Sequence, residues 1–301
     1  MRSRGTCALA AVLMAAVLFA LAGCHALETA GGPFAATRTE SASFPASGIP
    51  VIEVTASNGT VTVHGVAGQT DVRVVATLQS RGTSHSEASE HVSAVAVHME
   101  QQGSRVIVAY RAAEQTASLR SYSGASFDVT TPAVADVVAQ TNNGSMTVSG
   151  LRGRLDLTTS NGEVTIQSVV GEVKATTSNG RISLARCQGV LTLATSNGEV
   201  VMDDVSAAFD AKTSNGHIGF SGTVVGDANS LSTTNGRIDV AVSAAAAVEF
   251  HATTTAGSIT STLPLVGDTQ GKEWLATLNP PATAKLSLQT TNGGISIAAR
   301  P

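Results

Sequence analysis

An Asn-Gly pair recurs along this chain at a fixed interval, and this repeat constrains the fold more than any other feature of the sequence. Five copies follow one another at a spacing of 18 residues. Looser copies occur at Asn58 and Asn292, and Ala256 precedes a glycine at a similar place in the series. Such periodicity is typical of a protein built from stacked repeats. The asparagines of the regular series, with the copy that follows after 20 residues, are Asn143, Asn161, Asn179, Asn197, Asn215 and Asn235.

Apolar residues keep fixed positions after each pair. The residue two places after the glycine is apolar, as in Val164 and Ile182, and so is the residue two places further on, as in Ile166 and Leu184. The second half of each period alternates in the same way, for example at Val173. Alternation with a period of two predicts a strand with one buried face. Each period therefore contains two short strands.

The fold class that these patterns predict is all-β, in the form of a single-stranded parallel β-solenoid with rungs of about 18 residues. Equivalent strands stacked in parallel, about 4.8 Å apart, bury the same column in every rung. An antiparallel meander does not require identical residues at a fixed interval, and a propeller blade needs about 40 residues. We expect a right-handed coil, which is the usual chirality of parallel connections.

The Asn-Gly pair is expected to form a corner between strands. Asn tolerates the left-handed backbone region, Gly adopts it without cost, and stacked Asn amides can hydrogen-bond from rung to rung. The six asparagines are therefore predicted to form a structural ladder. The hydroxyl residues before them, such as Thr177 and Ser178, either extend this ladder or line a polar stripe that faces a carbohydrate.

Charged residues alternate in sign at the first outward position after the glycine. Opposite charges on neighbouring strands attract one another, so we expect ion pairs between rungs. The residues concerned are Glu163, Arg181, Glu199 and His217, with Asp156 and Lys174 as a further pair.

Four segments are expected along the chain. Residues 1–23 are a lipoprotein signal peptide, and residues 24–48 are the lipidated cysteine and a flexible tether. Residues 49–135 form an irregular amino-terminal β unit with one short helix, and residues 136–301 are the solenoid repeats, with an insertion loop at about 264–282 and a final rung after it.

The amino terminus resembles that of a bacterial lipoprotein precursor. Arg2 and Arg4 precede an apolar run, and Leu21-Ala22-Gly23-Cys24 follows. The resemblance implies cleavage before Cys24 and a diacylglycerol on its thiol, which with further acylation gives stable anchoring. We therefore expect membrane attachment through lipid on Cys24, at the outer membrane of a Gram-negative host or otherwise on the outer face of the cell membrane. An uncleaved membrane anchor and an ordinary secretory signal are the alternatives.

Charge and motifs exclude several functions. The formal net charge is −4 and no basic patch occurs, so nucleic acid is not an expected partner. No H-E-x-x-H, G-x-S-x-G, P-loop or G-x-G-x-x-G motif is present. We therefore expect no cofactor, no metal and no enzymatic activity.

The recurring T-S-N-G-x-[VI]-x-[VIL] pattern, seen at residues 159–166, 177–184 and 195–202, resembles the bacterial putative-adhesin family of uncharacterised β-solenoid domains. The resemblance extends over roughly residues 50 to 300 and implies a fold far more than an activity. Many members of that family look like envelope proteins.

Three functions follow from these expectations. The favoured one is a non-enzymatic adhesin or interaction module that presents a rigid surface to an unknown glycan or envelope protein. The second is an envelope scaffold or stress-related accessory protein that assembles through the ends of the solenoid. The third and weakest is a carbohydrate-active β-helix enzyme that uses Asp268, Glu273 and Trp274 near the insertion loop.

Overall fold

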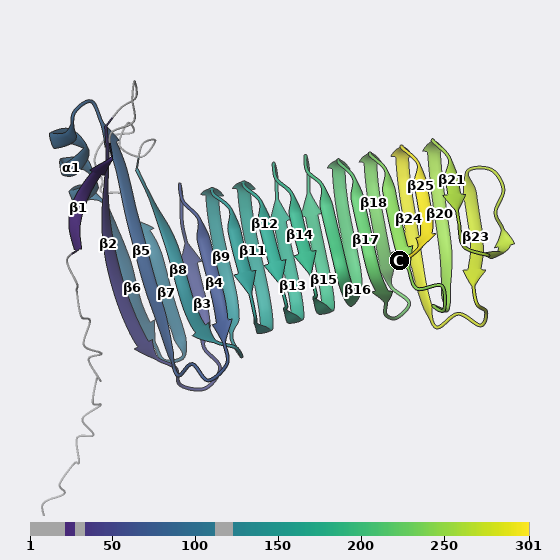
Figure 1. The fold of residues 1–301 in the computed structure, drawn as a ribbon, viewed down its shortest axis with the longest axis horizontal. Coiled ribbons are helices and arrows are strands. Elements are labelled where there is room, and N and C mark those ends of the chain that lie inside the picture. Colours follow the sequence, from purple (N-terminus) through teal and green to yellow (C-terminus); the bar gives the residue numbers. More distant parts are fainter. Residues whose placement is uncertain (1–21, 28–33, 112–122, 301) are drawn as a thin grey trace, which may run out of the picture.

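The structure is a computed structural model that describes residues 22–27, 34–111 and 123–300, with only the backbone described for 22–27. It is an elongated, solenoid-like stack of strands with one helix among these residues (Figure 1). The all-β prediction is confirmed. None of the helices in the described part has the length and apolar character needed to cross a membrane.

The repeats supply two series of parallel strands. In the first series, residues 18 apart pair directly, as Leu155 does with Val173. That series is β9 (Asp136–Asn143), β11 (Arg152–Asn161), β13 (Val170–Thr177), β15 (Gln188–Thr195), the second half of β16 (Val200–Asn215) and β18 (Asn229–Asn235). The second series is β10 (Met146–Ser149), β12 (Val164–Gln167), β14 (Ile182–Ala185), the first half of β16, β17 (Ile218–Val224) and β19 (Ile238–Val242).

The predicted apolar columns lie between these two series. Met146 pairs with Val164 and Val164 with Ile182, and all three side chains are buried. Leu155 and Leu157 are buried on the facing strands. Because alternate residues of a strand point to opposite faces, every rung contributes to one continuous core.

The amino-terminal part of the sheet is largely antiparallel whereas the repeats pair in parallel, so the sheet as a whole is mixed. Pairs β2–β5, β5–β8 and β6–β7 are antiparallel, whereas β3 and β4 pair in parallel with β9 and β10 as a first rung. These strands are β1 (Ala22–Leu27), β2 (Phe34–Pro45), β3 (Val51–Thr55), β4 (Val61–Val66), β5 (Asp71–Gly82), β6 (Ala96–Gln102), β7 (Arg105–Arg111) and β8 (Gly124–Pro132).

The expected short helix is present as α1 (His85–Ala94). The Ser84 side chain caps it by accepting a hydrogen bond from the backbone N–H of Glu87, at 3.2 Å. Ala88 and Val92 are its buried residues. The helix packs on β2 and β5 at the amino-terminal end of the stack (Figure 1).

The segment expected to be a flexible tether contains strands instead. β2 pairs along its whole length with β5, and β1 pairs with β2. Ala36, Ala42 and Phe44 of β2 are buried. β5 pairs with β8 on one edge and needs another strand on its second edge, which β2 provides. The small side chains of β2 are sufficient there because they pack against the apolar residues of β5.

The carboxyl-terminal rungs do not stack in sequence order. They comprise β20 (Val248–Ala256), β21 (Ile259–Ser261), β22 (Val266–Asp268), β23 (Glu273–Leu278), β24 (Ala284–Asn292) and β25 (Ile295–Ala299). β24 pairs in parallel with both β18 and β20, and β25 pairs with both β19 and β21. The expected final rung is therefore the last in sequence only, because it lies between the two rungs that precede it (Figure 1).

The expected insertion loop contains a short antiparallel hairpin. β22 pairs with β23, and β23 pairs with the outer edge of β20. Covering an edge strand in this way removes unpaired backbone groups that would otherwise bind another strand.

Candidate functional site

The six predicted asparagines form a ladder, and two further asparagines extend it. The Nδ2 of each donates to the Oδ1 of the asparagine in the preceding rung, at 2.8 to 2.9 Å. In stack order the ladder is Asn58, Asn143, Asn161, Asn179, Asn197, Asn215, Asn235 and Asn292. All seven bonds point the same way along the stack.

The two ends of the ladder differ. At the first end, the Nδ2 of Asn58 donates to the carbonyl of Ser123 at 3.1 Å. At the other end, the neighbour of Asn292 in the next rung is Ala256, which has no amide group. No hydrogen bond to the Oδ1 of Asn292 occurs within the described residues.

The corner glycines are required for close approach and not for a left-handed backbone, which corrects the expected role of the Asn-Gly pair. Neither residue of these pairs has a positive φ. Instead, a Cβ added to Gly180 would lie 1.9 Å from the carbonyl oxygen of Gly162, and the same holds at Gly198, at 1.8 Å from Gly180. The stacked corners are therefore too tight for any side chain.

The threonine column belongs to the corner, while the serine column is exposed. Thr177 is 2 % exposed, and its hydroxyl donates to the carbonyl of Gly162 at 3.2 Å. Thr195 repeats this contact with Gly180 at 3.0 Å. Ser178, next to Thr177, is exposed. Of the two readings of these hydroxyl columns, the threonines extend the ladder, and only the serines face solvent.

The residues with a left-handed backbone lie at the opposite corner of each rung. Ser168, Arg186 and Asp204 have φ of 54°, 54° and 52°, and Gly150 has 71°. The φ values of Gly153, Gly171 and Gly189, three residues further on, are also positive. Four different residue types, Gly150, Ser168, Arg186 and Asp204, occupy the equivalent left-handed position and give no shared signal in the sequence.

The predicted charge pairs form a network on the outer face of the second series. Glu199 binds the Arg181 guanidinium, and its Oε1 lies 2.8 Å from Nδ1 of His217. The Nε2 of His217 lies 2.9 Å from Oδ2 of Asp239, which also pairs with Arg237 at 2.7 Å. The hydrogen bonds from His217 and Arg181 hold the pKa of Glu199 below its usual range.

Glu199→Gln is expected to destabilise the protein at neutral pH by about 0.5–1 kcal/mol, the upper range for partly exposed ion pairs. The Glu199 pKa is depressed in the folded state, so its contribution is present above the unfolded pKa and is lost as pH falls through the folded one. The melting temperatures of the wild-type protein and of Glu199→Gln should therefore converge as the pH falls below 4.5, the ordinary pKa of a glutamate side chain. Glu163→Gln is the matched control, since no ion pair holds Glu163 among the described residues; an equal loss there would contradict this assignment.

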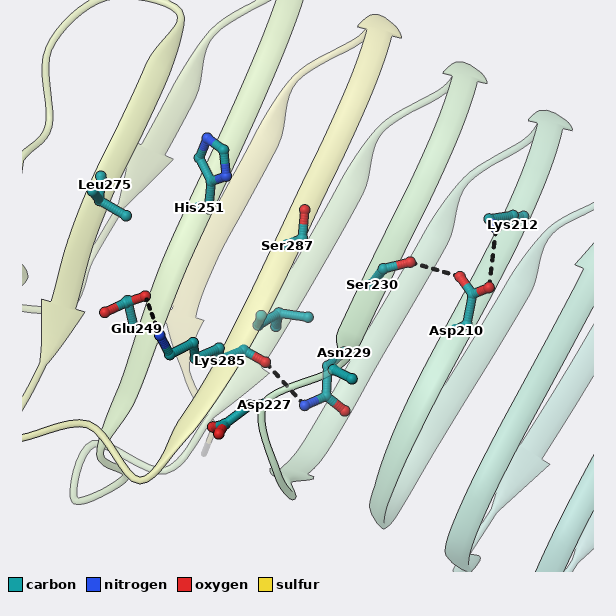
Figure 2. A pocket seen from close by; sticks show the side chains of 12 residues that line it. Asp210, Lys212, Asp227, Asn229, Ser230, Glu249, His251, Leu275, Lys285 and Ser287 are labelled. Carbon is teal, nitrogen blue, oxygen red and sulfur yellow. Dashed lines mark hydrogen bonds and ion pairs between the residues drawn. The ribbon is translucent and has the colours of Figure 1, made fainter.

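A groove of about 580 Å³ lies on the outer face of the first series, close to the carboxyl-terminal end (Figure 2). One row of the sheet explains it, because Asp210 pairs with Ser230, Ser230 with Ser287, and Ser287 with His251. The small serines of β18 and β24 thus lie between longer side chains on β16 and β20. The result is a trough two strands wide.

Asn229 closes one end of the groove. Its side chain is 4 % exposed, and its Nδ2 donates to the carbonyls of Gly226 at 2.8 Å and Lys285 at 2.9 Å. Its Oδ1 accepts from the backbone N–H of Phe209 at 2.9 Å. One amide therefore ties the irregular turn before β18 to both neighbouring rungs and keeps the groove in shape.

Each wall of the groove carries an ion pair (Figure 2). Asp210 lies 3.0 Å from Lys212 and also accepts a hydrogen bond from Ser230 at 2.6 Å. Across the groove, Lys285 lies 3.4 Å from Glu249. Asp227 also lines the groove and has no ion pair among the described residues. Because the other opposite charges are paired within the protein, the groove offers both donors and acceptors with at most a weak negative field.

The residues suggested for a carbohydrate-active enzyme have local roles. Asp268 accepts a hydrogen bond from the backbone N–H of Gln270 at 3.1 Å, and Glu273 lies 3.0 Å from Nε2 of His251. Trp274 packs against the core and is only partly buried. Cys187 is buried, and burial raises the pKa of its thiol.

Cys24, the predicted lipidation site, lies in β1, and its side chain is outside the described residues. Residues 1–21 of the predicted signal peptide also lie outside them. The anchoring prediction therefore stays a prediction.

Residues 186–298 match the family described as Toastrack DUF4097. This part of the chain, from the middle of the regular repeats through the groove to β25, therefore carries a Toastrack domain, which bears out the resemblance to the putative-adhesin family. No curated protein sequence matches the chain.

Several solved structures resemble the chain at a distance. A putative adhesin from Bacteroides fragilis is 12% identical, with a TM-score of 0.49, and the match covers 87% of this chain and 97% of that one. A putative adhesin from Parabacteroides distasonis is 13% identical, with a TM-score of 0.47 and the same coverage. A putative lipid-binding protein from that species is 10% identical, with a TM-score of 0.31 and again the same coverage. These likenesses are too distant to bear on function.

Proposed function

We propose that this protein is a non-enzymatic interaction module of the bacterial cell envelope, anchored through lipid on Cys24. In this proposal the repeats form a rigid, right-handed parallel solenoid with rungs of about 18 residues, which holds a binding face away from the membrane. The lipobox-like sequence at Leu21-Ala22-Gly23-Cys24 supports the anchor.

The groove between β16 and β20 is the observation that carries the binding part of the proposal. Its floor and ends are fixed by backbone ladders and by Asn229, so a partner would meet a preformed surface. An anionic ligand would have to break the Asp210–Lys212 or Glu249–Lys285 pair to reach a lysine, whereas a hydroxyl-rich ligand could bond to both walls. A glycan is therefore the favoured partner, with an envelope protein as the alternative.

A binding screen tests the groove. We expect the purified full chain in detergent to bind one saccharide class on a glycan and peptidoglycan array, and Ser287→Arg to abolish that binding by filling the trough. Ser183→Arg, on the second series of strands, is the matched control and should bind normally. Silence on the array, together with one envelope protein recovered by pull-down, would replace the glycan by a protein partner; binding that survives Ser287→Arg would remove the groove from the proposal.

Cys24→Ser tests the anchor. We expect the wild-type chain to fractionate with membranes and to carry acyl groups by mass spectrometry, and the variant to lose both, because two or more acyl chains are needed for stable attachment. A variant that stays with the membrane fraction would point instead to an uncleaved hydrophobic anchor.

Assembly through the ends of the stack is the weaker function. At the carboxyl-terminal end, β23 covers the outer edge of β20, which leaves that strand unable to pair with a second molecule. Concentration-dependent light scattering would favour assembly.

A further inference from the structure

The Asn-Gly corners have a chemical property that the ladder controls. In an Asn-Gly sequence the backbone nitrogen of Gly can attack the side-chain Cγ of Asn, because glycine has no side chain to hinder the approach. The C–Nδ2 bond breaks, the displaced nitrogen takes up the proton from the glycine nitrogen and leaves as ammonia, and a cyclic imide remains. Water then opens the ring to aspartate or isoaspartate. Asn is a thermolabile residue for this reason.

Inside the stack both reacting groups are held. The carboxamide of Asn215, for example, donates to Asn197 and accepts from Asn235. The attacking nitrogen is held as well, since the N–H of Gly216 donates to the carbonyl of Asn235 at 3.1 Å. To react, a corner such as Asn215 must give up both side-chain hydrogen bonds and one backbone hydrogen bond.

Asn292 is held on one side only. Its Nδ2 donates to Asn235 at 2.8 Å, but Ala256 in the next rung offers no donor to its Oδ1. The N–H of Gly293 donates to the carbonyl of Ala256 at 3.1 Å, as the N–H of Gly216 does to the carbonyl of Asn235. The difference between Asn292 and Asn215 therefore lies in the carboxamide, which is free to turn once one bond breaks.

The opposite end of the ladder is not equivalent. The Nδ2 of Asn58 donates to the carbonyl of Ser123, and its Oδ1 accepts from Asn143. Both the Nδ2 and the Oδ1 of Asn58 are therefore hydrogen-bonded. Because every amide donates in the same direction along the stack, the ladder ends with an acceptor that has no donor at Asn292.

We infer that Asn292 is a deamidation site, which becomes aspartate or isoaspartate in the folded protein faster than the fully hydrogen-bonded corners at Asn215 and Asn235. The reaction replaces a donor by a carboxylate that faces the Oδ1 of Asn235, and adds one negative charge at the corner between β24 and β25. Because β24 and β25 lie between two other rungs, the change weakens the carboxyl-terminal end of the stack from within.

The test is peptide mapping by mass spectrometry after incubation of the full chain in mildly alkaline buffer. In the folded protein we expect conversion at Asn292 to exceed that at Asn215 by roughly two- to tenfold, the rate factor that corresponds to one hydrogen bond. In urea the Asn-Gly corners should all convert at similar rates. Equal rates at Asn292 and Asn215 in the folded protein would overturn the inference.

Ala256→Asn provides a variant that should gain protection. Position 256 is exposed, and its new amide would donate to the Oδ1 of Asn292 in the direction of the ladder. We expect conversion at Asn292 to fall to the rate at Asn215 and the reactive corner to move to position 256. Thr255→Asn, also at an exposed position but outside the ladder column, is the matched control and should leave conversion at Asn292 unchanged. Unchanged conversion at Asn292 in the Ala256→Asn variant would show that the missing partner is not the cause.

Discussion

Gly180→Ala is expected to destabilise the protein by about 3 kcal/mol or more, enough to disorder the middle of the stack. The new Cβ would lie 1.9 Å from the carbonyl oxygen of Gly162 and 3.2 Å from Oγ1 of Thr177. Neither atom can retreat, because Thr177 donates to that same carbonyl and the next rung is stacked equally tightly. The measurement is the urea concentration at the midpoint of unfolding, monitored by circular dichroism.

Two variants calibrate that result. Gly219→Ala should cost about 1 kcal/mol or less, since the nearest atom to its new Cβ is Cε1 of the His217 side chain, at 3.2 Å. Asn179→Ala should fall between the two, because it removes the bonds to Asn161 and Asn197 but leaves room at the corner. A Gly180→Ala midpoint no lower than that of Gly219→Ala would mean that the corners can open, contrary to the close approach.

Removal of residues 284–301 is expected to unfold the last rungs of the stack. It deletes β24 and β25, with the buried side chains of Leu286, Leu288, Ile295 and Ile297, each contributing about 1.5–3 kcal/mol of burial. β18 and β20 each lose a parallel partner. Hydrogen exchange should show lost protection over 229–278 and retained protection over 136–213.

A shorter truncation is the control for that experiment. Removing only residues 300–301 deletes the Arg300–Asp204 ion pair, at 2.8 Å, but keeps β25. Its effect should stay within about 1 kcal/mol. Retained protection over 229–278 in the longer truncation would show that β18 and β20 can close on each other without the strands between them.

The regular part of the fold could be predicted because one periodic signal determined several features together. The inward columns, such as Val164 with Ile182, and the asparagine ladder through Asn179 both follow from identical residues stacked one period apart. The structural role of the corner glycines could not be predicted from the sequence. A glycine required for close approach to another rung and a glycine required for a left-handed turn look the same in the sequence.

The remaining errors arise where different arrangements give the same pattern. Asn292 follows Ala256 by two periods, which fits stacking after that rung as well as between it and Asn235. β2 escaped detection because Ala36 and Ala42 carry too little apolar surface to distinguish a strand from a linker. The groove could not be predicted because the sequence does not determine the stacking order of the last rungs. Ser230 and Ser287 become neighbours only in the observed order.

In the last rungs, the order in which residues are synthesised differs from their order in the stack. Residues 248–278 are synthesised before residues 284–299, yet their parallel contact with the rest of the stack passes through β24 and β25. The terminal rung and its hairpin therefore cannot take their final place in the stack until residues 284–299 have been synthesised. Folding can therefore proceed by adding one rung after another only as far as β19. In the last step, β24 and β25 pair on both sides, with β18 and β19 on one side and with β20 and β21 on the other.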